Sequence, residues 1–258
     1  MFRLCHDCRL LACRIACVLT LRPAQILDAS DDVHGAGELR LLDLAMSKSF
    51  GWTPNSAPPA QAVYRDQLQV LAEHYTRELS KLRNSDQPFV VDKNPFNFKW
   101  IGLILLAMPN AKIVHVKRCG CAVTWSMFRR FFNYENGFSY SLQELAEYYT
   151  LYKDMMQFWH NQFPGQVFDL DYESLTEQPI EETQRLFKHI GIEWHENVLK
   201  FYQSQRPVMT ASATQVKQQI YKGSSDVWKN YYRVRPNHLQ PLVNAIKCKV
   251  DEDLRLMQ

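Results

Sequence analysis

The chain contains little glycine, with 9 residues of this type among 258. It has no Gly-x-x-x-x-Gly-Lys-Ser/Thr sequence, the phosphate-binding loop typical of nucleotide kinases, and this absence weakens a nucleotide-kinase interpretation. Aromatic residues make up 12% of the chain, which argues against a disordered or low-complexity protein. The length allows one large domain or two small ones, with a sizeable buried core. No internal repeat is visible.

An excess of one charge and long hydrophobic runs are also missing. The formal net charge is +3, which suits an anionic ligand and is far too small to indicate a nucleic-acid partner. The apolar run from Leu10 to Leu21 is interrupted by Arg14 and is shorter than the ~20 residues of a membrane span. It makes a poor signal peptide because the charge falls inside its apolar part. A buried strand and a weak membrane anchor are the alternatives for this run.

The cysteines are unevenly distributed. Four lie at the N-terminus, two flank Gly120 and one stands alone: Cys5, Cys8, Cys13, Cys17, Cys119, Cys121 and Cys248. Cys5-x-x-Cys8 has the spacing of half a zinc or redox site, but no second matching pair follows, so we expect no metal. An odd number of cysteines in a chain too large to need disulfides favours reduced thiols and a cytoplasmic location.

Short apolar runs alternate with amphipathic segments along most of the chain. We expect strands at 89–91, 111–117 and 167–170, and loops at 31–38 and 206–225. Helices are expected near both ends of 22–48 and at 61–82, 96–108, 120–132, 141–163, 179–190, 195–204 and 237–246. This order predicts an α/β fold with a parallel sheet flanked by helices. The first 21 residues have an atypical composition, so we assign residues 22–258 to the domain itself.

The strand expected at 111–117 ends in two cations, Lys117 and Arg118, and Ser126 follows in the first turns of the next helix. A guanidinium and a hydroxyl beside a helix N-terminus suit a phosphate group. The alternative is a strand end with solvated cations. Lys93, Arg118 and Tyr172 each follow a different expected strand, and ligands of parallel sheets bind beyond the carboxyl ends of the strands. We therefore expect these three side chains to converge on one phosphate-binding crevice.

Several motifs together resemble those of the sulfotransferases that use 3′-phosphoadenosine 5′-phosphosulfate (PAPS). They occur in the family's order: Val33-His34-Gly35-Ala36-Gly37-Glu38-Leu39, Asp92-Lys93-Asn94-Pro95-Phe96-Asn97-Phe98, Pro109-Asn110-Ala111-Lys112-Ile113, Arg118 with Ser126, Asp171-Tyr172-Glu173-Ser174-Leu175, and Thr210-Ala211-Ser212-Ala213-Thr214-Gln215-Val216. The likeness covers about residues 22–247 and is greatest to bacterial sulfotransferases fused to tetratricopeptide repeats and to tyrosylprotein sulfotransferases. It implies a sulfotransferase fold like that of P-loop nucleotide kinases.

The resemblance also implies how the nucleotide is bound. Arg118 and Ser126 match the pair that grips the 3′-phosphate of PAPS. Tyr172 matches a tyrosine near the nucleotide. Ser212, with Thr210, matches a loop that closes over the adenosine. The implied co-substrate is PAPS, and no metal is needed.

The catalytic residues follow from the same resemblance. Lys93 matches the lysine that stabilises charge developing on the sulfuryl group and its bridging oxygen. Glu38 matches the general base of the tyrosylprotein branch, which removes a proton from the acceptor hydroxyl. Arg40 matches the arginine beside that base, and His34 is a substitute base or an acceptor contact. The implied partner is a hydroxyl-bearing acceptor (a peptide, a carbohydrate or a small molecule), and a homodimer is an open alternative.

The chain departs from the family where the 5′-phosphosulfate should bind. The family has a glycine-rich loop there, but residues 16–21 read Ala-Cys-Val-Leu-Thr-Leu and contain neither glycine nor arginine. Side chains with Cβ atoms hinder a nest of backbone amides around an anion. Cys119-Gly120-Cys121 also stands where the family has Asp-Pro. Two functions follow: an active sulfotransferase, or an impaired homologue that binds nucleotide or a partner without transfer.

Overall fold

The computed structural model describes residues 9–14, 21–52, 64–82, 87–132, 136–203 and 219–248. One five-stranded sheet has the order β2-β3-β1-β4-β5, and all of its pairings are parallel. The strands are β1 (Arg9–Arg14), β2 (Val33–Gly37), β3 (Phe89–Asp92), β4 (Lys112–Lys117) and β5 (Val167–Asp171). The predicted α/β fold with a parallel sheet is therefore confirmed.

The side chains of β4 show why this segment forms a central strand. Val114 and Val116 enter one hydrophobic cluster, whereas Ile113 enters another, as expected for side chains that alternate between the faces of a sheet. A strand that is buried on both faces reads as a nearly continuous apolar run. His115 points to the same face as Ile113 and is the one polar residue in the middle of this run.

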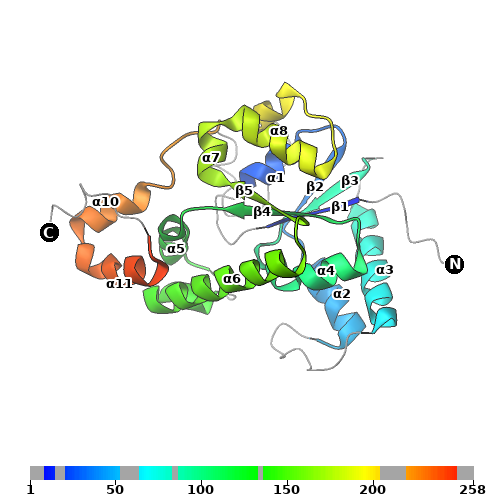
Figure 1. Cartoon of the computed structure of the whole chain (residues 1–258), viewed down its shortest axis with the longest axis horizontal. Coiled ribbons are helices and arrows are strands. Elements are labelled where there is room, and N and C mark those ends of the chain that lie inside the picture. The colour runs from blue at the N-terminus through cyan, green and yellow to red at the C-terminus, as the bar shows by residue number, and fades with distance from the viewer. Residues whose placement is uncertain are drawn as a thin grey trace.

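Helices cover both faces of the sheet (Figure 1). The face on the upper side of that view carries α1 (Leu21–Asp28), α7 (Tyr172–Glu177), α8 (Pro179–Ile190) and the 3₁₀ helix η3 (Glu196–Gln203). The other face carries α2 (Leu41–Phe50), α3 (Arg65–Leu82), η1 (Pro95–Trp100), α4 (Ile101–Ala107) and α6 (Leu142–Gln162). Beyond the strand ends lie α5 (Gly120–Phe128), η2 (Gly137–Tyr140), α10 (Val227–Val234) and α11 (Pro236–Ile246).

The N-terminal run contributes the middle strand of the sheet. β1 pairs with β3 from Arg9↔Phe89 to Ala12↔Asp92, and with β4 on its other side. Residues 10–14 of the Leu10–Leu21 run belong to this strand, as the buried-strand alternative expects. Of the segment at 16–21, where the phosphosulfate loop was expected, residues 16–20 lie outside the described residues.

The expectation of a loop at 31–38 is wrong, because Val33–Gly37 forms strand β2. Its two glycines give it low strand propensity, but pairing with β3 overrides that preference. Gly35 is needed for a close approach: its amide donates to Asp28 Oδ1 at 2.6 Å, and a Cβ atom there would lie 2.8 Å from that carboxylate. Gly37 has a φ of +79°, which favours glycine.

Most of the expected helical segments are present, but several differ from the expectation in type or in length. The segment at 195–204 is a 3₁₀ helix, and the helix after Arg118 ends at Phe128, earlier than expected. Helices α7 and α10 were not predicted from the sequence. Among the described residues, no helix combines the length and the apolar character that spanning a bilayer requires.

The expectation of reduced thiols is wrong for one pair, because Cys121 and Cys248 form a disulfide. The two residues are 127 positions apart in the sequence, so spacing gave no sign of the bond. The disulfide joins the start of α5 to the end of α11, within the cluster that these helices form with α10. Since disulfides persist in oxidising compartments, the predicted cytoplasmic location loses this part of its support.

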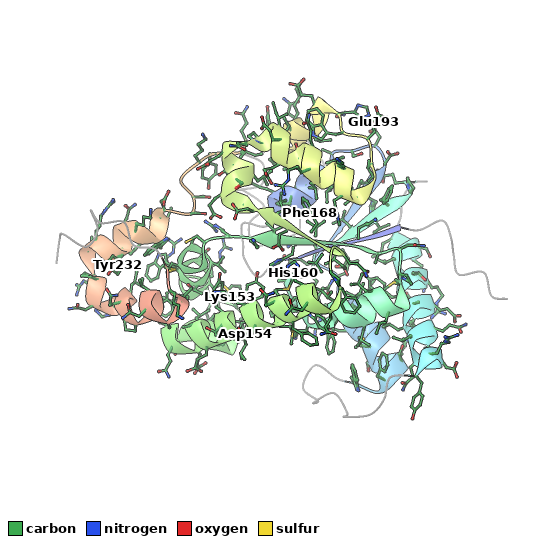
Figure 2. The ribbon with its side chains drawn as sticks, in the orientation of Figure 1. Lys153, Asp154, His160, Phe168, Glu193 and Tyr232 are labelled. Carbon is green, nitrogen blue, oxygen red and sulfur yellow. A yellow bond between two sulfur atoms is a disulfide. The ribbon has the colours of Figure 1, made fainter. Side chains whose placement is uncertain are left out.

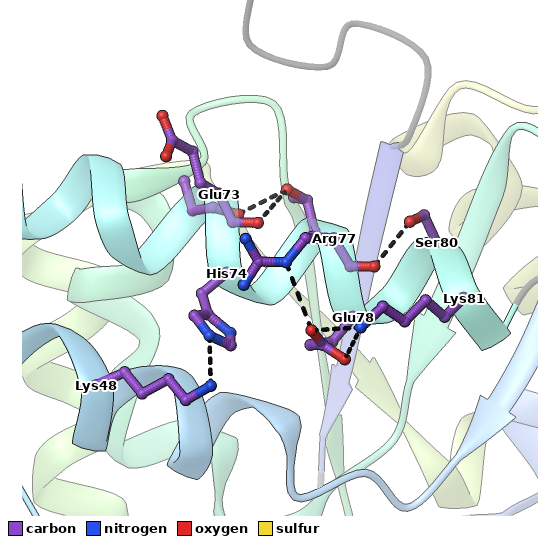
Figure 3. A network of polar contacts seen from close by, with 9 residues as sticks. Lys48, Glu73, His74, Arg77, Glu78, Ser80 and Lys81 are labelled. Carbon is purple, nitrogen blue, oxygen red and sulfur yellow. Dashed lines mark hydrogen bonds and ion pairs between the residues drawn. The ribbon is translucent and has the colours of Figure 1, made fainter.

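A surface network joins α2 to α3 far from the strand ends (Figure 3). Lys48 Nζ donates to His74 Nε2 at 2.7 Å. Partial burial and the charge of Lys48 lower the pKa of His74, which favours the neutral ring that can accept this bond. Lys81 and Arg77 both contact the Glu78 carboxylate on the same helix. Exposed pairs of this kind contribute little to stability.

Candidate active site at the carboxyl ends of the strands

Four of the predicted site residues directly follow strand ends. Glu38 follows β2, Lys93 follows β3, Arg118 follows β4, and Tyr172 begins α7 after β5. Because every strand is parallel, these ends lie at one edge of the sheet. Lys93, Arg118 and Tyr172 therefore lie at the same edge of the sheet, and that they share one phosphate-binding crevice stays a prediction.

Glu38 and Lys93 form an ion pair in which Lys93 Nζ donates to Glu38 Oε1. The lysine side chain is 2% exposed and the glutamate side chain is 46% exposed. The backbone also joins the two segments, since the Lys93 amide donates to the Gly37 carbonyl at 2.9 Å. A buried ammonium thus meets a carboxylate that reaches solvent, which places a proton acceptor and a fixed positive charge side by side.

Buried polar groups hold Lys93 in place. Its neighbour Asp92 is fully buried and accepts hydrogen bonds from Tyr75 Oη at 2.6 Å and from Asn97 Nδ2 at 3.2 Å. Burial raises the pKa of Asp92 to about 6, although these two hydrogen bonds lower it in part. On the other side, Asn94 Nδ2 donates to the Leu39 carbonyl at 2.6 Å. These bonds fix the segments after β2 and β3 relative to each other.

Two further candidates are on or just after β2. His34 is the second residue of β2 and pairs with Val90. It precedes Glu38 by four residues, or about 13 Å of extended chain. Arg40 is exposed beside the start of α2.

Two buried arginines flank Tyr172. The Arg118 guanidinium lies 5.3 Å from the centre of the Tyr172 ring, and Arg22 Nη1 donates to the Tyr172 hydroxyl at 3.0 Å. Arg118 also donates through Nε to Ser225 Oγ at 2.9 Å and through Nη2 to the Ser224 carbonyl at 2.6 Å. The segment after residue 218 therefore lies directly against the predicted phosphate-binding arginine.

Arg22 was not identified from the sequence. It is 2% exposed, and its Nε and Nη2 atoms have no hydrogen-bond partner in the described part of the chain. The Tyr221 ring covers its guanidinium at 4.3 Å. A buried cation with unpaired donors is costly unless an anion pairs with it. An arginine right after the expected phosphosulfate loop was the sequence signal that could have pointed to it.

A pocket of about 530 Å³ opens beside Arg118. Its wall includes Ser126, and its cations are Arg118, Arg129, Arg130 and Lys222. Arg118 and Ser126, paired by the sequence analysis, therefore line one pocket. Four cations around one pocket provide the field that a phosphate-bearing ligand requires. Arg129, Arg130 and Lys222 were not predicted as site residues, although two adjacent arginines near the end of an expected helix were a visible signal.

Some predicted positions fall outside the described residues. These are Thr210 and Ser212, expected to close over the adenosine, and the segment at 15–20. Their roles remain predictions of the sequence analysis.

Sequence comparison finds sulfotransferases. The sulfotransferase family profile matches residues 24–196. An uncharacterized protein of Aquifex aeolicus is 34% identical over 244 residues, which cover 91% of this chain and 32% of that protein. The chain thus spans about a third of the length of that relative. A putative protein-tyrosine sulfotransferase of Caenorhabditis elegans is 28% identical over 180 residues, covering 68% of this chain and 67% of the relative.

Structure comparison agrees with this result. The sulfotransferase domain of the Synechococcus PCC 7002 olefin synthase superposes with a TM-score of 0.60 at 14% identity, over 89% of this chain and 91% of that domain. A mouse sulfotransferase solved in complex with PAP superposes with a TM-score of 0.52 at 11% identity, over 97% of this chain and 88% of the mouse protein. At such identities the superpositions show the fold alone. With the profile match over residues 24–196, they confirm the predicted resemblance: this chain belongs to the sulfotransferase family.

Proposed function

We propose that the protein transfers a sulfuryl group from PAPS to an acceptor hydroxyl. The main support is the pocket lined by Arg118 and Ser126, whose further cations suit a ligand with several phosphate charges. Arg22 strengthens the fit, because two of its donor atoms find no hydrogen-bond partner among the described residues and would be satisfied by an anion next to Tyr172. Thr210 and Ser212 keep their predicted role in closing over the nucleotide.

In this reaction the acceptor oxygen forms a bond to sulfur, and the bond from sulfur to the bridging oxygen of PAPS breaks. The acceptor proton passes to Glu38, and 3′-phosphoadenosine 5′-phosphate (PAP) leaves with the bonding electrons. Lys93, fixed by burial, stabilises the negative charge that develops on the bridging oxygen. The exposed side of Glu38 lets the acceptor approach from solvent. None of these steps requires a metal ion.

The acceptor is proposed at the level of a hydroxyl group. Relatives in Caenorhabditis elegans and Caenorhabditis briggsae are named putative protein-tyrosine sulfotransferases, so a tyrosine-containing peptide is the first acceptor to test. Carbohydrate and small-molecule alcohols are the alternatives. Arg40, exposed beside Glu38, is the proposed contact for an acidic acceptor. A cytoplasmic location, a homodimer and the absence of a nucleic-acid partner stay predictions of the sequence analysis.

A second function is binding of the nucleotide without transfer. The observation in its favour is the sequence of residues 16–21, which lacks the glycine and arginine expected to hold the 5′-phosphosulfate. Calorimetry with PAP and PAPS separates the two functions. Tighter binding of PAPS than of PAP, together with transfer of ³⁵S-labelled sulfate to an acceptor, supports the sulfotransferase. Equal affinities with no transfer to peptide, carbohydrate or alcohol acceptors overturn it in favour of the binding protein.

A further inference from the structure

Two histidines and an aspartate meet on the α6 face of the sheet, away from the strand ends. His115 on β4 and Asp169 on β5 are register partners, so their side chains lie side by side on that face. His160 reaches them from α6, and Figure 2 shows it on the part of that helix that lies against the sheet. None of these residues takes part in the proposed sulfuryl transfer.

The three side chains already converge on one point. His115 Nδ1 lies 2.6 Å from Asp169 Oδ1, and His160 Nε2 lies 3.1 Å from the same oxygen. One ligand atom from each residue can be chosen so that all three lie within 4.8 Å of one another. In a tetrahedral zinc site with bonds of about 2.0–2.1 Å, neighbouring ligand atoms are about 3.3 Å apart. Small rotations of these side chains would therefore admit an ion.

We propose that His115, His160 and Asp169 form a binding site for a zinc ion. Two imidazole nitrogens and one carboxylate oxygen are ligands that Zn²⁺ prefers, and three protein ligands leave a fourth position for water. The site is open on one side, since the His160 and Asp169 side chains are each 31% exposed. The inference does not rest on the proposed sulfuryl transfer.

The surroundings of the cluster orient its buried ligand. His115 is 3% exposed, and its other ring nitrogen, Nε2, lies 2.5 Å from the Tyr152 hydroxyl. Tyr152 and His160 are eight residues apart, just over two helical turns, and so present both groups on one face of α6. With Nδ1 on the metal, Nε2–H donates to the Tyr152 oxygen, which fixes the tautomer and the ring orientation.

Lys117 sets the strength of the site. Its Nζ contacts the other carboxylate oxygen, Asp169 Oδ2, at 3.1 Å, so Oδ1 remains directed at the imidazoles. The ammonium also places a positive charge close to the ion, which weakens binding of a cation. Because the Lys117 side chain is 47% exposed, it can turn toward solvent. This arrangement predicts that removing the lysine charge strengthens zinc binding, whereas removing a ligand weakens it.

A bound ion would join β4, β5 and α6 behind the nucleotide pocket. His115 lies on β4, three residues, or about 10 Å, before Arg118, which directly follows the strand. Tyr152 also lines a small apolar cavity together with Arg118. The ion would therefore stiffen the strand that delivers the phosphate-binding arginine, and this role is structural.

The test is a titration of chelator-treated protein with Zn²⁺ against a chromophoric competitor. The background is Cys5→Ser with Cys8→Ser, so that thiols in this pair do not bind the added zinc. We expect one zinc per chain at the site, weakened at least about tenfold by His160→Ala and strengthened by Lys117→Met. The control is His195→Ala, because His195 is exposed and lies outside the cluster.

X-ray absorption at the zinc edge supplies the second measurement. Nitrogen and oxygen neighbours at about 2.0–2.2 Å without sulfur support the site. Equal zinc affinity for the background protein and its folded His160→Ala variant overturns the proposal, because the bound metal then sits elsewhere. Absence of zinc binding in the folded background protein also overturns it and leaves the cluster as a hydrogen-bond network.

Discussion

Lys93 and Glu38 lie 55 residues apart in the sequence, yet their side chains form an ion pair across the ends of the neighbouring strands β3 and β2. The pair has one buried and one accessible partner. A solvated acceptor can therefore reach the carboxylate while the ammonium stays fixed by its surroundings. This asymmetry fits a base that must exchange protons with the substrate beside a charge that must not move.

Glu38→Gln should lower kcat for sulfuryl transfer by about 10²–10⁴-fold, because an amide cannot accept the acceptor's proton. The affinity for PAP should stay unchanged, since Glu38 is not assigned to the nucleotide. Transfer kinetics and calorimetry on the same preparation check both statements. Glu73→Gln is the matched control, an exposed carboxylate on α3. A kcat close to wild type in the Glu38 variant would remove the residue from the catalytic role.

Arg118→Lys should weaken PAP binding by about 1.5–3 kcal/mol, or roughly tenfold to 150-fold. Lysine keeps the charge but loses the planar fork that pairs with phosphate oxygens. Arg233→Lys is the control, because Arg233 is exposed and donates to Asn230 on its own helix, α10. Thermal melts of both variants exclude unfolding as the cause, given that Arg118 also holds Ser224. Unchanged affinity for PAP in the folded variant would contradict the phosphate assignment.

The parts of this molecule that are local in sequence were predictable, and the parts that depend on distant contacts were not. Buried runs such as 111–117 identify strands because a strand covered on both faces must be apolar throughout. Strand β2 was not predicted from the sequence. Its glycines allow close backbone packing, and only its pairing with β3 makes the segment a strand. Likewise α10 owes its place to packing of Trp228 and Tyr232 against α11.

The candidate site also has features that the local sequence predicts and features that depend on distant contacts. Strand ends are readable, so Lys93, Arg118 and Tyr172 could be assigned to one edge of the sheet from the sequence. Arg22 could not be assigned to the site from the sequence. Its importance depends on its burial and on donor atoms that have no hydrogen-bond partner among the described residues. The disulfide between Cys121 and Cys248 could not be predicted for a related reason. The two residues are 127 positions apart and meet only because α5 and α11 pack together.

Arg22→Met should reduce the stabilisation that PAP gives to the protein. In the wild type, the unpaired Nε and Nη2 donors should gain an anionic partner when ligand binds, which raises the melting temperature. Methionine fills a similar volume without charge, so the ligand-free protein should lose little stability or gain some. Differential scanning fluorimetry with and without PAP measures both effects. Arg65→Met, at an exposed position on α3, is the control. An identical PAP-induced shift in the Arg22 variant would show that this residue binds no part of the nucleotide.

Asp92 should make stability depend on pH in a direction opposite to that of a salt-bridged carboxylate. Burial raises its pKa to about 6 in the folded protein, against about 3.9 in an unfolded chain. Between these values the folded state holds a proton that the unfolded state has lost, so this group makes the free energy of unfolding fall as pH rises. Asp92→Asn removes the ionisable group and keeps its shape.

The advantage of Asp92→Asn over wild type in urea unfolding should therefore grow by about 2 kcal/mol between pH 4 and pH 6. Asp66→Asn, an exposed carboxylate on α3, should not reproduce this trend. A constant difference between wild type and the Asp92 variant across that range would show that burial does not perturb this carboxyl group.

Cys248→Ser should lower the free energy of unfolding by about 2–4 kcal/mol, because the Cys121–Cys248 disulfide closes a loop of 127 residues in the unfolded chain. Urea unfolding of oxidised protein measures the effect, and dithiothreitol should lower the stability of wild type to nearly that of the variant. Cys119→Ser is the matched control, since Cys119 is two residues away and carries a free thiol. The loss of stability in Cys248→Ser should be accompanied by weaker PAP binding. The reason is that the disulfide ties α11 to α5, the helix that presents Ser126 to the pocket beside Arg118. Equal stability of oxidised wild type and Cys248→Ser would show that packing of Cys121 against α11 suffices without the covalent bond.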